Sequence, residues 1–168
     1  MNFFVFLLNF FISKPVLFKI ILKENWNILD PLKEFIKKKA PSFINSNIFL
    51  DYEYSFIKNN GQIVPHVDAL RKYQSLMLYF PDSIFDDYSY GTSFWESDEK
   101  NWDNIHIENE EDRKNFKKKN KIIYQTPFEA NCLYGFLRND FSWYSVEPKN
   151  INQNYIRKSI NINFYYTN

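Results

Sequence analysis

The chain has 168 residues, 45% of them hydrophobic and 24% charged, which indicates one domain with a core of ordinary size. Its formal net charge of +1 argues against a nucleic-acid protein whose affinity depends on a basic surface. The single cysteine, Cys132, excludes a disulfide framework and a multi-cysteine metal cluster. With only 3 glycines, the chain has no P-loop and no dinucleotide fingerprint.

Two apolar stretches, residues 3–12 and 16–22, open the chain. A membrane-spanning helix needs about 20 apolar residues, and polar residues interrupt the first stretch well before that length. A secretory signal begins with positive charge, whereas the first lysine here, Lys14, follows the apolar stretch. We therefore expect a buried strand or helix in a cytoplasmic protein, with a membrane anchor or an export signal as the alternative.

Asp30 and Pro31 mark the start of a helix, because Asp caps free N–H groups and Pro fits the first turn. The helix should run to about Lys39 and place Leu32, Phe35 and Ile36 on one face. We expect residues 1–47 to form an apolar segment with one or two helices that pack on a domain of residues 48–168.

From Ile48 the hydrophobic period changes to two, which predicts a half-buried strand followed by a turn at Asn59-Asn60-Gly61. Further strand candidates are residues 62–68, 73–80, 121–125, 131–137, 141–146 and 155–166. The charged insertion at 96–120 is typical of a solvated loop or a short surface helix. These elements predict a mostly β (α+β) barrel or sandwich with helices outside.

His66 and Asp68 lie two residues apart at the end of a strand candidate, so their side chains should face the same side. One imidazole and one carboxylate make up two-thirds of the facial triad that holds non-haem Fe(II). The alternative is a buried histidine beside a capping aspartate, and the H-x-D tripeptide alone favours that alternative.

The last strand candidate alternates polar and apolar residues, with Arg157 and Ser159 on its polar face. Such a face usually meets water. In a small barrel it can instead line the lumen, where Arg157 would clamp a carboxylate and Ser159 would add a hydroxyl.

Six segments occur in a characteristic order between Ile48 and Tyr166. They are G-Q-I-V-P-H-V-D at 61–68, Q-S-L-M-L-Y-F-P-D at 74–82, Y-G-T-S-F at 90–94, N-C-L-Y-G-F at 131–136, S-W-Y-S-V-E-P at 142–148 and R-K-S-I-N at 157–161. In this order the chain resembles the 2-oxoglutarate/Fe(II) oxygenase superfamily, in its prolyl-hydroxylase-like branch. The resemblance implies a double-stranded β-helix (a cupin-like jelly roll), His66 and Asp68 as iron ligands, and Arg157 with Ser159 at the distal carboxylate of 2-oxoglutarate.

The chain departs from this family at Tyr144, where the family has its second histidine ligand. Tyr144 could ligate iron as a phenolate, which requires a phenol with a pKa near 10 to lose its proton. Alternatively, iron binds weakly through two ligands and waters, or the site is inactive. We expect the remaining histidine, His106, to lie at the surface of the charged insertion; the alternative is that this loop folds over the mouth of the barrel and brings His106 to the site.

The resemblance implies a hydroxylase that inserts oxygen into a C–H bond while 2-oxoglutarate is decarboxylated to succinate. Its cofactors would be Fe(II) and 2-oxoglutarate as cosubstrate, with ascorbate as an optional addition. The substrate class stays open among protein side chains, glycans and small metabolites, as does the oligomeric state, and we expect no nucleic-acid or membrane partner. The alternatives are a non-catalytic relative that binds a carboxylate or a partner, and a cupin-like sugar- or ligand-binding barrel.

Overall fold

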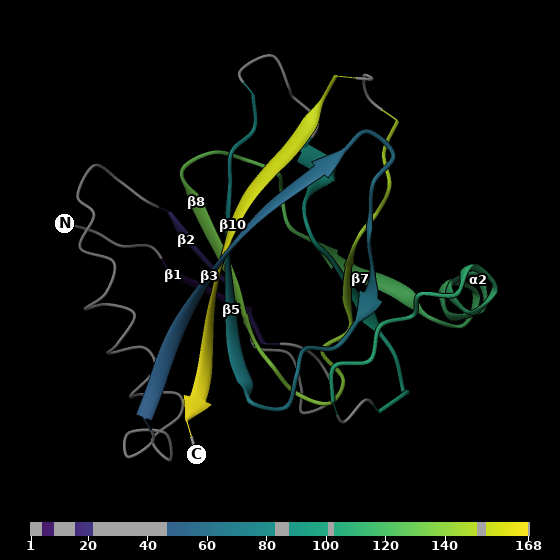
Figure 1. Ribbon diagram of the computed structural model, residues 1–168, viewed down its shortest axis with the longest axis horizontal. Coiled ribbons are helices and arrows are strands. Elements are labelled where there is room, and N and C mark those ends of the chain that lie inside the picture. The colour runs from purple at the N-terminus through teal and green to yellow at the C-terminus, as the bar shows by residue number, and fades with distance from the viewer. Residues whose placement is uncertain are drawn as a thin grey trace.

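A computed structural model describes residues 5–8, 16–21, 47–82, 88–100, 103–150 and 154–167, and the features below refer to these residues (Figure 1). The strands are β1 (Val5–Leu8), β2 (Val16–Ile21), β3 (Asn47–Lys58), β4 (Ile63–His66), β5 (Lys72–Tyr79), β6 (Ser93–Glu96), β7 (Lys121–Gln125), β8 (Cys132–Leu137), β9 (Tyr144–Val146) and β10 (Ile156–Thr167). The helices are the short 3-10 helix η2 (Tyr88–Tyr90) and the α-helix α2 (Glu110–Lys119). The helix predicted over residues 30–39 lies outside the described residues.

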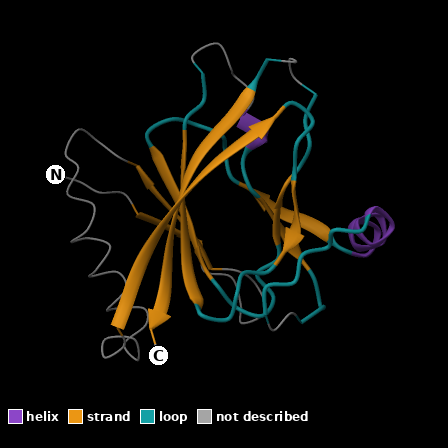
Figure 2. Cartoon of the chain, in the orientation of Figure 1, coloured by secondary structure: helices purple, strands orange, loops and turns teal. Residues whose placement is uncertain are grey.

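The strands form two antiparallel sheets, seen on the left and right of Figure 2. The larger sheet has the order β1-β2-β8-β5-β10-β3, and the smaller has the order β4-β9-β6-β7. The predicted mostly-β jelly-roll class is confirmed. Both opening apolar stretches contribute a strand to the larger sheet, as one of the two sequence alternatives proposed.

The burial of residues in β10, the last strand, shows which of its two faces lies inside. Arg157, Ser159 and Asn163 are buried, whereas Ile156 on the opposite face is exposed. β10 pairs with β3 on one side and with β5 on the other, and the burial of its polar side chains shows that they face the interior between the two sheets. The prediction of a polar face in the lumen is therefore correct, and the alternative of a polar face in water is wrong.

The space between the sheets is filled largely by aromatic rings. The main buried cluster includes Met77, Tyr79, Phe94, Phe128, Tyr134 and Phe136. Such rings bury large apolar areas and fix the distance between the sheets around the polar residues of the lumen.

Part of the charged insertion folds as α2, which packs beside the smaller sheet (Figure 1). Asn109 caps its first turn by accepting hydrogen bonds from two backbone N–H groups. Phe116 is the buried residue of the helix, and it packs against Trp95 and Trp143. Among the described residues, no helix is long and apolar enough to cross a membrane.

Candidate functional site

His66 is the last residue of β4 and faces Tyr144 of β9 in the register of the smaller sheet. The two ring centroids are 4.1 Å apart. Nδ1 of His66 donates to the carbonyl of Val64 at 2.8 Å, because a carbonyl only accepts. Burial lowers the pKa of His66 to about 4, so the imidazole is neutral at pH 7.

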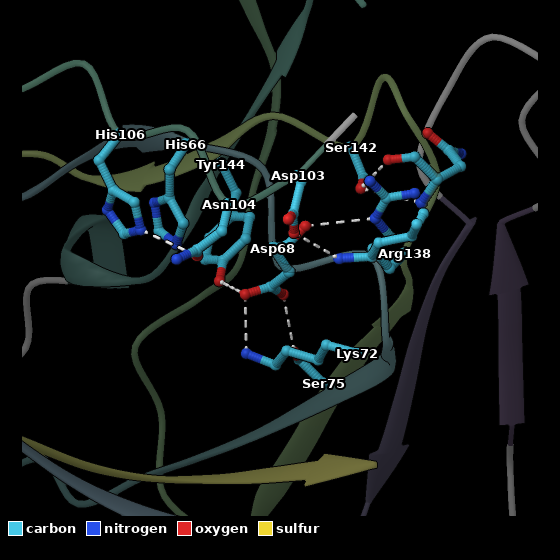
Figure 3. A network of polar contacts seen from close by, with 12 residues as sticks. His66, Asp68, Lys72, Ser75, Asp103, Asn104, His106, Arg138, Ser142 and Tyr144 are labelled. Atoms are coloured by element: carbon cyan, nitrogen blue, oxygen red, sulfur yellow. Dashed lines mark hydrogen bonds and ion pairs between the residues drawn. The ribbon is translucent and has the colours of Figure 1, made fainter. Parts of the chain in front are cut away.

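His106 lies in the loop before α2 and forms a backbone bridge with His66. Its ring stacks on that of His66 with the centroids 4.4 Å apart and the planes within 10° of parallel. The His106 side chain is exposed, as the sequence predicted, and its Nε2 lies 3.2 Å from Oδ1 of Asn104. His106 therefore covers one face of the His66 ring, a contact that the sequence did not predict (Figure 3).

Asp68 follows β4 and is buried at the centre of a polar network (Figure 3). Its Oδ1 accepts hydrogen bonds from Nζ of Lys72 and from the hydroxyl of Tyr144, each at 2.8 Å. Its Oδ2 accepts from the hydroxyl of Ser75 at 3.1 Å. Both carboxylate oxygens are thus engaged by protein donors, one of which carries a full positive charge.

Tyr144 donates its hydroxyl proton to Asp68. Burial raises the pKa of Tyr144 well above its usual value of 10, and the nearby negative charge of Asp68 raises it further. The phenol is therefore protonated at neutral pH. In this state the phenol is a hydrogen-bond donor to Asp68.

The arrangement of these donors does not fit an iron centre. The structure brings His66, Asp68 and Tyr144 together as the sequence predicted, but Asp68 already neutralises an ammonium group. The described part of the chain holds no group of three or more His, Cys, Asp or Glu side chains placed to share a metal ion. Sequence reasoning missed Lys72 and Ser75, although the first half of β5 carries three polar residues ahead of an apolar second half.

Arg157 forms a second polar centre inside the barrel, with a side chain only 1% exposed. Its Nε donates to the carbonyl of Tyr90 at 2.9 Å, and its Nη1 donates to Ser159 at 3.1 Å. The guanidinium carbon lies 5.0 Å from the ring centroid of Tyr79 and 5.3 Å from that of Phe128. Burial lowers the pKa of Arg157, and no described carboxylate lies within ion-pair distance of it.

A cluster of hydroxyl groups lies beside this guanidinium. The hydroxyl of Tyr79 is 2.9 Å from Oγ1 of Thr92 and 2.7 Å from Oγ1 of Thr126. Gly91 makes this approach feasible, since a Cβ at that position would lie 1.8 Å from the carbonyl oxygen of Thr126. The sequence segment Y-G-T-S-F contained two of these residues, but their contact with Thr126 joins segments 34 residues apart.

Comparison with known proteins gives a structural neighbour and no match in sequence. No family model matches the chain, and no curated protein matches it. The crystal structure of a prolyl-4-hydroxylase from Pseudomonas putida is similar with a TM-score of 0.49 and 14% sequence identity. The match covers 83% of this chain and 63% of the hydroxylase.

Proposed function

We propose that the barrel binds a small dicarboxylate of the 2-oxoglutarate class through Arg157, without the help of a metal. The observation that carries this proposal is the buried guanidinium of Arg157, which has no carboxylate partner among the described residues. A buried charge is costly unless an opposite charge and hydrogen bonds compensate it. A carboxylate ligand supplies both, because it can accept two parallel N–H bonds from a guanidinium.

The surroundings of Arg157 support an anionic ligand. Its contacts with Ser159 and the carbonyl of Tyr90 fix the plane of the guanidinium and use two of its five N–H groups. The rings of Tyr79 and Phe128 exclude water, which strengthens any charge-assisted bond that the remaining N–H groups make. The resemblance noted in the sequence assigns a carboxylate to the same two residues, Arg157 and Ser159.

A second candidate is the Fe(II)/2-oxoglutarate-dependent hydroxylase that the resemblance implies. It is favoured by the meeting of His66 and Asp68 at the end of β4. It requires Asp68 to exchange Lys72 and Tyr144 for a metal ion. Both candidates bind 2-oxoglutarate, and they differ in whether that binding needs Fe(II). The cupin-like alternative is distinct, because it predicts that Arg157→Ala leaves ligand binding unchanged.

The test is isothermal titration of 2-oxoglutarate and of succinate into the purified chain, once with EDTA and once anaerobically with Fe(II). We expect binding that EDTA leaves unchanged and that Arg157→Gln weakens by roughly 30-fold, which corresponds to about 2 kcal/mol for a charge-assisted bond. Lys158→Gln is the matched control, because this neighbour in β10 pairs with Asp82 at the surface.

Each outcome separates the candidates. Binding of 2-oxoglutarate that appears only with Fe(II), together with release of succinate once oxygen is admitted, would support the hydroxylase instead. If Arg157→Gln binds 2-oxoglutarate as tightly as the wild type, the ligand carboxylate binds at a site other than Arg157. Failure of both carboxylates to bind under either condition would refute both proposals for a chain shown to be folded.

A further inference from the structure

The ion pair between Lys72 and Asp68 is buried, which is unusual because lysine side chains usually lie at the protein surface. The two side chains are 9% and 7% exposed, and the Nζ–Oδ1 distance is 2.8 Å. In each of the other ion pairs between described residues, at least one side chain is 28% or more exposed. Lys72 is therefore a buried cation that the fold holds directly on the carboxylate of Asp68.

The local backbone explains how Lys72 reaches this position. The N–H of Lys72 donates to the carbonyl of Ala69 at 2.9 Å, which closes the turn between β4 and β5. The turn brings the first residue of β5 back over Asp68, four positions earlier. Ser75 and Tyr144 also donate to the carboxylate, so donors from two strands, β5 and β9, fix its orientation.

We infer that the Lys72 ammonium is the resident cation of Asp68 and takes the place that a divalent metal would need. A metal ion at Asp68 would have to displace a buried positive charge, or lie beside it at a large electrostatic cost. Tyr144, at the position where the resemblance implies a histidine, is then only half of the difference from a metal site. Replacing Tyr144 by histidine adds an imidazole nitrogen as a third ligand beside His66 and Asp68. It leaves the Lys72 ammonium on the Asp68 carboxylate.

This inference concerns the Asp68 end of the barrel and does not depend on what Arg157 binds. Its test is the titration of Mn(II), alone and without any carboxylate, followed by the loss of the free-ion electron paramagnetic resonance signal. The proteins compared are the wild type, Tyr144→His, Lys72→Met and the double variant Lys72→Met/Tyr144→His. Lys72→Arg keeps a cation at the site, and Lys158→Met is the control for loss of a surface lysine.

We expect the wild type and Tyr144→His to leave the Mn(II) signal unchanged. The double variant should bind one Mn(II) at least about tenfold more tightly than Tyr144→His, with Lys72→Arg/Tyr144→His behaving like Tyr144→His. Lys72→Gln/Tyr144→His serves as a second neutral replacement, because glutamine can still donate a hydrogen bond to Asp68 if the methionine variant does not fold.

Two results would overturn the inference. One is Mn(II) binding by the wild type that Asp68→Asn removes. The other is a folded neutral double variant that binds Mn(II) no better than Tyr144→His. Since no carboxylate is present in these titrations, either result leaves the Arg157 proposal to its own test.

Discussion

Nζ of Lys72 lies 2.8 Å from Oδ1 of Asp68, and both side chains are less than a tenth exposed. The pair between Lys158 and Asp82 has a similar composition but lies at the surface, with side chains 42% and 46% exposed. Water screens the surface pair and not the buried one, so removing one partner has very different consequences in the two places.

Asp68→Asn should lower the free energy of unfolding by roughly 3 kcal/mol or more, because it leaves the buried ammonium of Lys72 without a counter-charge. Urea denaturation at neutral pH measures this change. Asp82→Asn is the control and should cost less than about 1 kcal/mol. If Asp68→Asn instead raises the free energy of unfolding, the Asp68 carboxylate is destabilised by electrostatic repulsion in the wild type, as in a metal site without its ion.

Acid should destabilise the chain through His66. Its pKa is about 4 in the folded state and 6.5 in the reference state, so between these values the unfolded chain binds the extra proton. Stability therefore falls as the pH drops from 6.5 towards 4, by about 2 kcal/mol between about pH 7.5 and about pH 5 for this group. Urea denaturation at the two pH values should show a smaller loss for His66→Gln, and an equal loss in both proteins would contradict the assignment.

Tyr144→Phe tests the hydrogen bond between the phenol and Asp68. The substitution keeps the ring beside His66 and Phe136 but removes the donor at 2.8 Å. We expect a loss of about 1–2 kcal/mol in unfolding free energy, as for a hydrogen bond to a charged acceptor. Tyr52→Phe, at an exposed site on β3, is the control. An unchanged stability would mean that the phenol contributes nothing to holding the carboxylate.

Gly91→Ala tests the close contact beside Arg157. The new Cβ would lie 1.8 Å from the carbonyl oxygen of Thr126, so the backbone next to Tyr90 must move. Since the carbonyl of Tyr90 accepts from Arg157, the substitution should lower stability by roughly 1–3 kcal/mol and weaken carboxylate binding as well. Thermal denaturation and the 2-oxoglutarate titration check the two effects. Full affinity in this variant would show that the Tyr90 carbonyl does not position the guanidinium.

The sequence predicted most strands because their signal is local. The period of two along β3 and the turn that follows it are visible in the residues themselves, and Asn60 indeed has a φ of 60°. The prediction that this strand is half-buried is wrong, because Tyr52, Tyr54 and Phe56 on its apolar face are more than half exposed. β6 was missed because its four residues are mostly buried and give no alternation. The helix α2 was predicted only as an option, although its cap Asn109 and its final run of lysines were both present in the sequence.

The sequence by itself determined the strand periods, the convergence of His66 with Asp68 and the polar face that carries Arg157. Only the tertiary structure decided that this polar face lies inside, because closure of the sheets, not local periodicity, chooses between lumen and solvent. It also decided which side chains contact the Asp68 carboxylate. Tyr144 reaches Asp68 across 76 residues of chain, and Lys72 reaches it through a turn whose direction no periodicity encodes. Contacts of this kind depend on how strands are brought together, so they appear only once the two sheets have formed and packed on each other.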